Sequence, residues 1–476
     1  KRRKIMRMTK KIVALGLVAV CAFNLSAAGK KKMTKDEKAE MKQLEKLYKN
    51  EPEFKDPKTG KLYDFGGMEV LIGDWWSPTA GAETKPVANK ADEDTRKWHK
   101  YLQYKYNFVC KQVGLGNWNQ HPQTIANFCV VGGDENYVFV VDNRSATTGF
   151  KSDLYLDLNK VTDVNWNDKK YNKAVWDLMT KNGKTFGCRP LAPEPRTGFF
   201  FNKRLLSEAN IDPESIYDMQ KAGTWTWENF EKVLKKVTRD IDNDGIIDVW
   251  GMGNNVSEFC NLMLASNGGS IIERDAKGKY YNNLESAASI EAITWIQKMY
   301  KSYQKPTPEG ANWDWCYAAF KNGETAFLCE QEYYAQNFGD MLDDYGFVVA
   351  PKGPRIKDYH CDAIDNIYVI PSIYGVEKGS KIAKIFDIYM SPTPGYDDDD
   401  AWKEEFYSYF RDNRAVDETL AIMRTNAKPR LLNFIPGLEN PMYDFWGSVY
   451  EGWETPQEAT ERVRNPWQAL IDEANK

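Results

Sequence analysis

Residues 188–252 constrain the fold of this chain more than any other stretch. Their Gly-Phe-Phe-Phe run at 198–201 predicts a buried strand, and the Pro-rich segment before that run favours extended backbone. After Asn202 and Lys203 the pattern changes directly to that of a helix. We interpret this stretch as a place where the chain crosses from one part of the molecule to another, not as a catalytic loop.

The chain has 476 residues, which is too long for a single hydrophobic core and enough for two lobes of ordinary size. Its net charge of −4 gives no basic surplus, which argues against a nucleic acid partner. Aromatic residues are numerous, with 16 Trp, 26 Tyr and 22 Phe. Surplus Trp and Tyr suit flat apolar ligand faces such as sugar rings, although a large aromatic core would explain any one of them.

Residues 1–28 have the features of a signal peptide. Basic residues at 1–4 precede an apolar run at 12–25, which is too short to span a bilayer and ends in small residues. We therefore expect the mature protein to work outside the cytoplasm. Ala28 stands where a lipoprotein signal would carry its lipidated Cys, so no lipid is expected at that position. Residues 29–65 are rich in Lys and Glu and predict a tether or helical extension before the first domain.

Two motifs near the crossing resemble those of family 1 extracellular solute-binding proteins. They are Phe-Phe-Phe-Asn-Lys-Arg-Leu-Leu at 199–206 and Thr-Trp-Thr-Trp-Glu-Asn-Phe at 224–230. Similar family motifs follow in order at 318–327, 345–351 and 367–371. The family comprises ligand receptors of ABC importers, with the maltodextrin-binding type as a familiar member. The resemblance implies a type II periplasmic-binding-protein-like fold, in which two α/β lobes are joined by a multi-crossing hinge, and it brings no catalytic site.

The resemblance spans residues 66–470 and implies how the chain is divided. Residues 66–193 and 361–413 are expected in the first lobe, and residues 194–360 and 414–476 in the second. The implied function is to capture an oligosaccharide in the cleft between the lobes and to deliver it to the permease subunits of an ABC transporter. We expect a monomer at the bacterial cell surface or in the periplasm, which meets the membrane only through the permease or a lipid anchor.

One strand delivers aromatic residues to the expected cleft. The strand at 68–73 ends next to Trp75 and Trp76, and open α/β sheets bind ligands at the carboxyl ends of their strands. These two residues are therefore candidates for one wall of the cleft.

A second strand, at 137–141, ends in Asp142 and Arg144. In the family the matching turn hydrogen-bonds sugar hydroxyls, but a helix cap with a surface ion pair would explain the same two residues. Between the two strands, residues 128–131 predict an edge strand. The resemblance adds further candidate ligand-binding residues, which are Glu194, Arg196, Glu258, Phe259, Glu330, Tyr333, Tyr334, Asp365, Asn366 and Trp446.

Other functions stay open from the sequence. A secreted carbohydrate-active enzyme needs only two suitably placed carboxylates, which an Asp- and Glu-rich chain never excludes. However, the chain has only three His residues and shows no nucleophile motif or metal-ligand cluster of an enzyme, so we expect no enzyme. A receptor for a peptide or another small non-sugar solute is the main alternative. Arg144 and Arg196 also leave uronate-bearing sugars open.

One loop matches the ligand order of a calcium-binding loop. Gly245 stands at its sixth position, where a sharp turn is needed, but Gly251 replaces the twelfth-position Glu of the full motif. A similar loop in longer relatives of the family binds calcium structurally, away from the ligand. An Asp-rich connecting turn is the alternative. The expected Ca²⁺ ligands are Asp240, Asp242, Asp244, Ile246 through its carbonyl, and Asp248.

Overall fold

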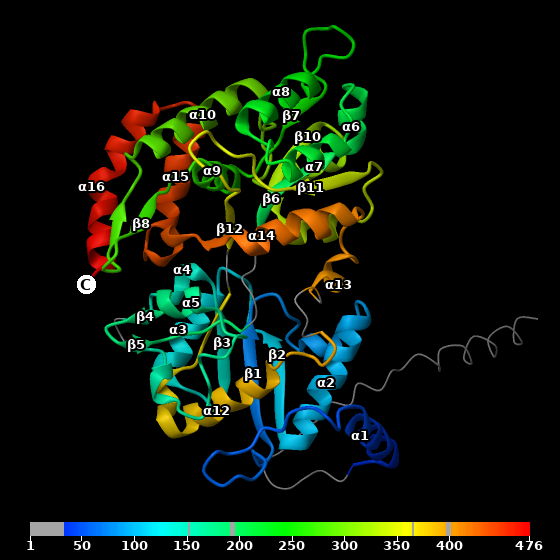
Figure 1. Ribbon diagram of the computed structural model, residues 1–476. Helices are drawn as coiled ribbons and strands as arrows, with labels where there is room; N and C mark the ends of the chain where they lie inside the picture. Colours follow the sequence, from blue (N-terminus) through cyan, green and yellow to red (C-terminus); the bar gives the residue numbers. More distant parts are fainter. Residues whose placement is uncertain (1–32, 151–152, 191–195, 364–365, 397–399, 401) are drawn as a thin grey trace, which may run out of the picture.

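The computed structural model describes residues 33–150, 153–190, 196–363, 366–396, 400 and 402–476. Figure 1 shows two α/β lobes, one above the other, with the C-terminus at the upper one. The predicted fold class is therefore confirmed. We call the lower unit the first lobe and the upper unit the second lobe.

The first lobe is built on a four-stranded sheet in the order β13-β3-β1-β2. β1 runs parallel to β2 and β3, whereas β13 pairs antiparallel with β3. Helices pack on both faces, so β3 buries alternate side chains in two different cores. The strands are β1 (Met68–Asp74), β2 (Phe108–Gly114), β3 (Tyr137–Val141) and β13 (Ile367–Val369). The main covering helices are α2 (Lys90–Tyr106), α3 (His121–Val131) and α12 (Gly375–Tyr389).

The edge strand predicted at 128–131 is wrong, because these residues form the last turn of α3. Ile125 and Cys129 lie one helical turn apart and are both buried against the sheet. Val130 and Val131, which suggested a strand, are exposed instead. The apolar period of the segment is thus that of a helix, and the two β-branched residues were misleading.

The second lobe is built on a sheet in the order β11-β6-β10-β7. All six residues of β6 are buried, because helices cover both faces of its sheet; this explains the unbroken Phe run. The strands are β6 (Thr197–Asn202), β7 (Trp250–Met252), β10 (Thr325–Gln331) and β11 (Tyr345–Val348). The longer helices are α7 (Glu214–Lys221), α8 (Trp227–Val237), α9 (Val256–Ala265), α10 (Ala287–Tyr303), α15 (Glu439–Tyr450) and α16 (Pro456–Ala474).

Shorter elements complete both lobes. Those of the first lobe are η2 (Ala82–Thr84), α4 (Asn143–Ala146), η3 (Leu158–Lys160), α5 (Lys173–Leu178), β4 (Thr180–Lys181), β5 (Lys184–Thr185) and η5 (Ser372–Tyr374). Those of the second lobe and of the segment returning to it are α6 (Lys203–Glu208), β8 (Ile272–Arg274), β9 (Tyr280–Asn282), α11 (Trp315–Lys321), η4 (Glu332–Phe338), α13 (Lys403–Phe406) and α14 (Ala421–Asn426). η7 (Leu431–Phe434) packs with both lobes, because Leu432 is buried in the second-lobe core and Phe434 in the first-lobe core.

The second lobe takes in more of the chain than the sequence suggested. β12 (Cys361–Ala363) pairs with β14 (Ala427–Pro429), and Cys361 is buried in the core of the second lobe. Phe410 is buried in that same core, although residues 361–413 were expected in the first lobe. The segment around β12 and the segment around Phe410 therefore pack with the second lobe.

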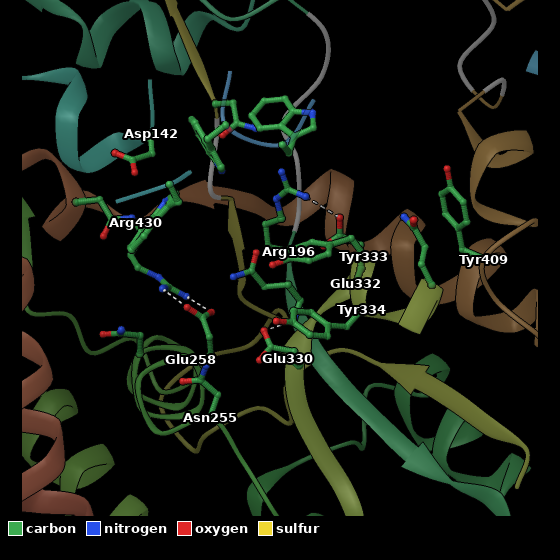
Figure 2. A pocket seen from close by; sticks show the side chains of 18 of the residues that line it. Asp142, Arg196, Asn255, Glu258, Glu330, Glu332, Tyr333, Tyr334, Tyr409 and Arg430 are labelled. Atoms are coloured by element: carbon green, nitrogen blue, oxygen red, sulfur yellow. Dashed lines mark hydrogen bonds and ion pairs between the residues drawn. The ribbon is translucent and has the colours of Figure 1, made fainter. Parts of the chain in front are cut away.

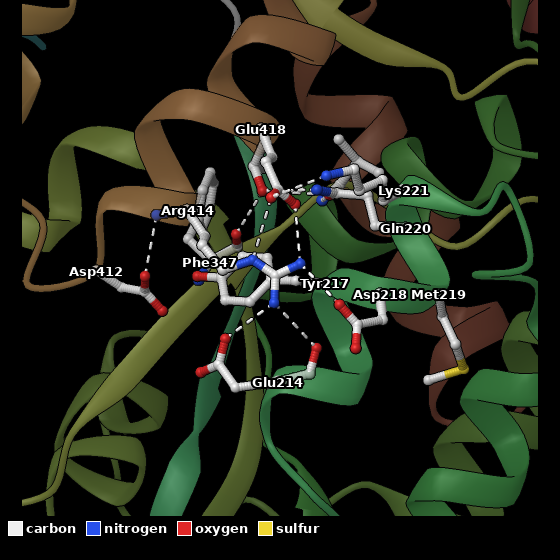
Figure 3. A network of polar contacts seen from close by, with 12 residues as sticks. Glu214, Tyr217, Asp218, Met219, Gln220, Lys221, Phe347, Asp412, Arg414 and Glu418 are labelled. Atoms are coloured by element: carbon white, nitrogen blue, oxygen red, sulfur yellow. Dashed lines mark hydrogen bonds and ion pairs between the residues drawn. The ribbon is translucent and has the colours of Figure 1, made fainter.

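A partly exposed ion network holds the chain where it returns to the second lobe, just before the π-helical turn η6 (Ala415–Leu420). Figure 3 shows Arg414 at the centre of this network. One of its terminal nitrogens donates to Glu214 at 2.9 Å, and the other donates to Asp218 at 2.9 Å and to Glu418 at 3.1 Å. These contacts tie η6 to α7.

The predicted N-terminal extension contains a helix, α1 (Lys35–Leu47), which Thr34 caps. Met41 and Leu44 are buried against the first lobe, and the ring of Tyr48 packs on the first-lobe helix α2. The predicted signal peptide at 1–28 lies outside the described residues. Among the helices that the structure describes, none combines the length and apolar content needed to cross a bilayer.

Candidate ligand-binding cleft

A cleft of about 2030 Å³ lies between the lobes and is lined by residues of both. Part of its wall is seen in Figure 2. The predicted ligand-binding residues that line it are Trp75, Trp76, Asp142, Arg196, Glu258, Glu330, Tyr333, Tyr334, Asn366 and Trp446. Glu194 and Asp365 lie outside the described residues, and the side chain of Arg144 is not among those described.

The first-lobe wall carries two indole rings at the end of β1. The buried Asp74 carboxylate accepts hydrogen bonds from the backbone nitrogen of Trp76 at 3.0 Å and from Gln112 Nε2 at 2.6 Å. This turn brings the rings of Trp75 and Trp76 edge to face, with centroids 4.8 Å apart. Trp76 stays 42% exposed, so it offers an open apolar face to the cleft.

Asp142 follows β3 and serves as a helix cap. Its Oδ1 accepts hydrogen bonds from the backbone nitrogen and the hydroxyl of Ser145, both at 3.0 Å. The cap that the sequence left as an alternative is therefore present, and Asp142 lines the cleft at the same time.

The second-lobe wall carries a cluster of aromatic rings at the end of β10. Tyr333 and Tyr334 lie on η4 with ring centroids 4.9 Å apart, and Tyr317 of α11 lies 4.5 Å from Tyr334. Trp313 meets Tyr317 edge to face at 6.0 Å and is 69% exposed. These rings form a stepped apolar surface along the second-lobe side of the cleft.

Arg196 braces this surface. Its guanidinium group lies 5.5 Å from the centroid of the Tyr333 ring and pairs with Glu332 at 3.1 Å. Glu332 in turn donates its backbone N–H to the carbonyl of Arg196 at 2.8 Å. The cation–π contact and the ion pair together hold Arg196 against η4.

A buried ion network lies deeper in the second-lobe wall. Arg430 binds Glu258 through both terminal nitrogens at 3.2 and 3.1 Å, and it donates to Asp362 at 3.0 and 2.7 Å (Figure 2 shows the Glu258 pair). His360 contacts Asp362 at 2.9 Å. Burial alone would raise the pKa of Asp362, but the charge of Arg430 and the His360 contact outweigh it and lower that pKa to about 2.

Glu330 is the one acidic side chain of this wall that is buried without a cation among the described residues. Its carboxyl group accepts hydrogen bonds from Tyr317 at 2.7 Å and from the backbone nitrogen of Gln331 at 2.8 Å, and only 2% of the residue is exposed. Burial, followed by the nearby charge of Glu258, raises the pKa of Glu330 to about 8.

Phe259, predicted to bind ligand, does not line the cleft. It is completely buried in the second-lobe core beside Phe199, because neighbouring residues on a helix point about 100° apart and Glu258 takes the cleft side. Trp446 does line the cleft, but its ring is buried and donates Nε1–H to Asn261 at 2.9 Å. Trp446 is thus part of the packed wall, not an open stacking face.

The cleft also contains residues that the sequence did not identify, which are Gln112, Trp118, Trp313, Tyr317, Glu332, Tyr409 and Arg430. Trp313 and Tyr317 border the family motif at 318–327, so their proximity to it was the one available signal. No local motif marks Arg430, whose partners lie far away in the sequence.

The predicted calcium loop lies away from the cleft, between α8 and β7. Carboxylate oxygens of Asp240, Asp242 and Asp244 all lie within 4.8 Å of one another. Each of these three carboxylates also accepts a hydrogen bond from a backbone nitrogen of the loop, as Asp248 does from Ile241 at 2.6 Å, but Asp248 is not part of the converging group. Three of the four predicted carboxylates therefore converge, which fits the oxygen ligands that Ca²⁺ prefers.

Comparison with known proteins places this architecture in a family. The family model for bacterial extracellular solute-binding proteins matches residues 132–384. No curated protein matches the chain. The GacH receptor of Streptomyces glaucescens is 13% identical, with a TM-score of 0.59 over 85% of this chain and 99% of that one.

Two further solved structures are similar. The sugar-binding protein MalE of Xanthomonas citri is 15% identical, with a TM-score of 0.61 over 86% of this chain and 98% of that one. UgpB of Mycobacterium tuberculosis, solved with glycerophosphocholine, has the same identity and TM-score over 86% of this chain and 99% of that one. At these identities the likeness concerns the fold alone, whereas the family model covers more than half of the chain. The chain belongs to the family of bacterial extracellular solute-binding proteins.

Proposed function

We propose that this protein is the substrate-binding receptor of an ABC importer, and that it captures an oligosaccharide in the cleft between its lobes. The observation that carries this proposal is the pair of aromatic walls, with exposed Trp76 on the first lobe and exposed Trp313 and Tyr333 on the second. Aromatic faces next to hydrogen-bonding side chains suit the apolar faces and hydroxyl groups of sugar rings. The likeness to GacH, solved with acarbose, and to the sugar-binding protein MalE supports the same ligand class.

The two cleft walls belong to different lobes, so ligand binding can be coupled to movement of the lobes. A ligand shifts an open–closed equilibrium only when it binds one state more tightly than the other. An oligosaccharide can contact Trp76 and Tyr333 at the same time only in the closed state, in which both walls reach it. Hinge closure around the ligand would then present a loaded, closed form to the permease subunits.

We propose binding without turnover. Glu258, whose charge acts on Glu330, is bound to Arg430 and to the hydroxyl of Thr197, which supports a structural role in the wall. A non-sugar solute is the second candidate, because UgpB, with the same fold, was solved with glycerophosphocholine.

We further propose an extracytoplasmic location, as the family description implies, with export through residues 1–28 and function as a monomer. A permease would then be the only protein partner required. Attachment to the membrane would run through the permease or through a lipid anchor.

A structural calcium ion is proposed for the loop after α8. The ion would be held by the carboxylates of Asp240, Asp242 and Asp244, with Asp248 and the Ile246 carbonyl completing the set. Its role would be to offset the mutual repulsion of the converging carboxylates, away from the cleft.

Isothermal titration calorimetry against a panel of neutral oligosaccharides tests the main proposal. We expect one member to bind with a stoichiometry of one, and chromatography of the recovered sugar to show it unchanged. Binding only to peptides or phosphodiesters would favour the second candidate, whereas loss of the sugar on incubation would identify an enzyme.

A further inference from the structure

Glu330 stands apart from the other acids of the second-lobe wall. Glu258 is neutralised by Arg430, and Glu332 by Arg196. Among the described residues, no cationic side chain forms an ion pair with Glu330, although Glu330 is equally buried. A buried carboxyl group that faces another carboxylate and lacks a counter-charge is costly unless some other group neutralises it.

The groups around Glu330 favour a cation over an anion. Glu258 faces it from α9, and the phenol of Tyr317 holds it from α11. The electron-rich rings of Tyr317 and Tyr334 lie side by side, next to the Tyr333 ring. Ring faces beside a carboxylate form the arrangement by which proteins bind ammonium groups.

The two arginines of the wall bind other carboxyl groups and not Glu330. Arg430 is engaged with Glu258 and Asp362, and Arg196 with Glu332 and the Tyr333 ring. Neither guanidinium group of this network forms an ion pair with Glu330, so within the part of the chain that the structure describes only a proton neutralises that carboxyl group in the empty cleft, and a cationic ligand group could replace it.

We propose that the ligand carries an ammonium group, as an amino sugar or another amine-bearing oligosaccharide does, and that this group binds Glu330 beside the rings of Tyr317 and Tyr334. The inference rests on the proposed oligosaccharide receptor and specifies its ligand class. It disfavours uronate-bearing ligands, whose carboxylates would meet Glu330 and Glu258.

The charge state of Glu330 gives the inference a second readout. Because burial and the charge of Glu258 keep its pKa at about 8, most Glu330 carries a proton at pH 7 in the empty cleft. An ammonium group favours the carboxylate, so an amine that is already protonated in solution should release about one proton on binding, whereas a neutral amine should take over the Glu330 proton with no net release. A neutral sugar should release none.

The test compares matched ligand pairs by calorimetry at pH 7, once in phosphate and once in Tris. These buffers have different ionisation enthalpies, so the difference between the two measured binding enthalpies gives the number of protons released. The pairs are cellotetraose with fully deacetylated chitotetraose, and maltotetraose with acarbose, in which a secondary amine replaces a bridging oxygen. We expect at least one amine member to bind about tenfold or more tightly than its partner, with proton release from Glu330 in proportion to the fraction of that amine already protonated at pH 7.

Glu330→Gln keeps an acceptor for Tyr317 and should abolish both the preference and the proton release. Glu324→Gln is the matched control, because it makes the same change just before β10 and outside the cleft. If neither amine member binds more tightly, or if the preference survives in Glu330→Gln, the inference is wrong. Equal binding of the neutral members would leave the oligosaccharide receptor standing, whereas no oligosaccharide binding at all would reject both proposals.

Discussion

The two walls of the cleft are built differently. In the first-lobe wall, Asp74 and Asp142 are occupied with holding the backbone of a turn and of a short helix. In the second-lobe wall, Arg196 and Arg430 bind acids that face the cleft itself. Both walls thus supply apolar faces, whereas the buried arginine–carboxylate network belongs to the second-lobe wall.

The largest expected effect comes from breaking the ion network of the second wall. Arg430→Ala leaves Glu258 and Asp362 buried without their cation, and we expect it to lower the free energy of unfolding by about 3–5 kcal/mol. Urea denaturation measures this loss. The matched change in the first wall, Asp142→Ala, removes a helix cap and should cost about 1 kcal/mol.

Arg464→Ala serves as the control for removing an arginine, because Arg464 pairs with Glu285 at the exposed surface. It should change the stability little. Equal losses for Arg430→Ala and Arg464→Ala would contradict the distinction between a buried and a surface network.

Calcium should affect the second lobe without affecting the cleft. If the loop binds the ion, free Ca²⁺ a hundredfold above its dissociation constant stabilises the folded form by about 2.7 kcal/mol. Differential scanning calorimetry in EDTA and in millimolar CaCl₂ measures the shift, while sugar affinity should stay the same. Asp242→Asn should reduce the shift; identical melting curves in both buffers would show that the loop binds no calcium.

Acid should weaken the second wall through Asp362. Its pKa in the folded protein is about 2, below its ordinary value of 3.8. Its contribution, roughly 2 kcal/mol, is therefore present above about pH 4 and is lost as the pH falls toward 2. Unfolding free energies measured across this range should fall less steeply in Asp362→Asn than in the wild type; parallel curves would count against the assignment.

Single aromatic changes should have smaller effects, and similar ones on the two walls. Trp76→Ala and Tyr333→Ala should each weaken sugar binding about tenfold, equivalent to ~1.4 kcal/mol, with unchanged folding. The losses should add in the double variant, because the residues lie on different lobes. Trp453→Ala, exposed but outside the cleft, is the control. An effect of Tyr333→Ala alone would mean that only the second wall binds ligand.

Local patterns in the sequence were enough for the framework of the fold. The Phe run of β6 predicted a fully buried strand, and Trp75 and Trp76 were placed correctly at the end of β1, because a strand end is a local feature. Val130 and Val131 misled because strand propensity says little when a helix period buries only every third or fourth residue.

The charged part of the site could not be predicted in this way. Glu258 and Arg430 are 172 residues apart, and no spacing rule links them. Phe259 was misassigned because the sequence does not show which of two adjacent helix residues faces the cleft. Ion pairs between distant residues, and the orientation of a helix toward the cleft, depend on how distant elements pack. A local sequence pattern does not contain this information.

The buried thiols make this molecule convenient for optical work. All seven cysteines after residue 28 are free and buried, and burial raises the pKa of Cys129 and Cys316 to about 12. Only the thiolate reacts quickly with maleimide dyes, so the native thiols should stay unlabelled in the folded protein. Dyes on Lys169→Cys and Gln336→Cys, which lie at the cleft on opposite lobes, would then report lobe closure by energy transfer without removal of any native cysteine.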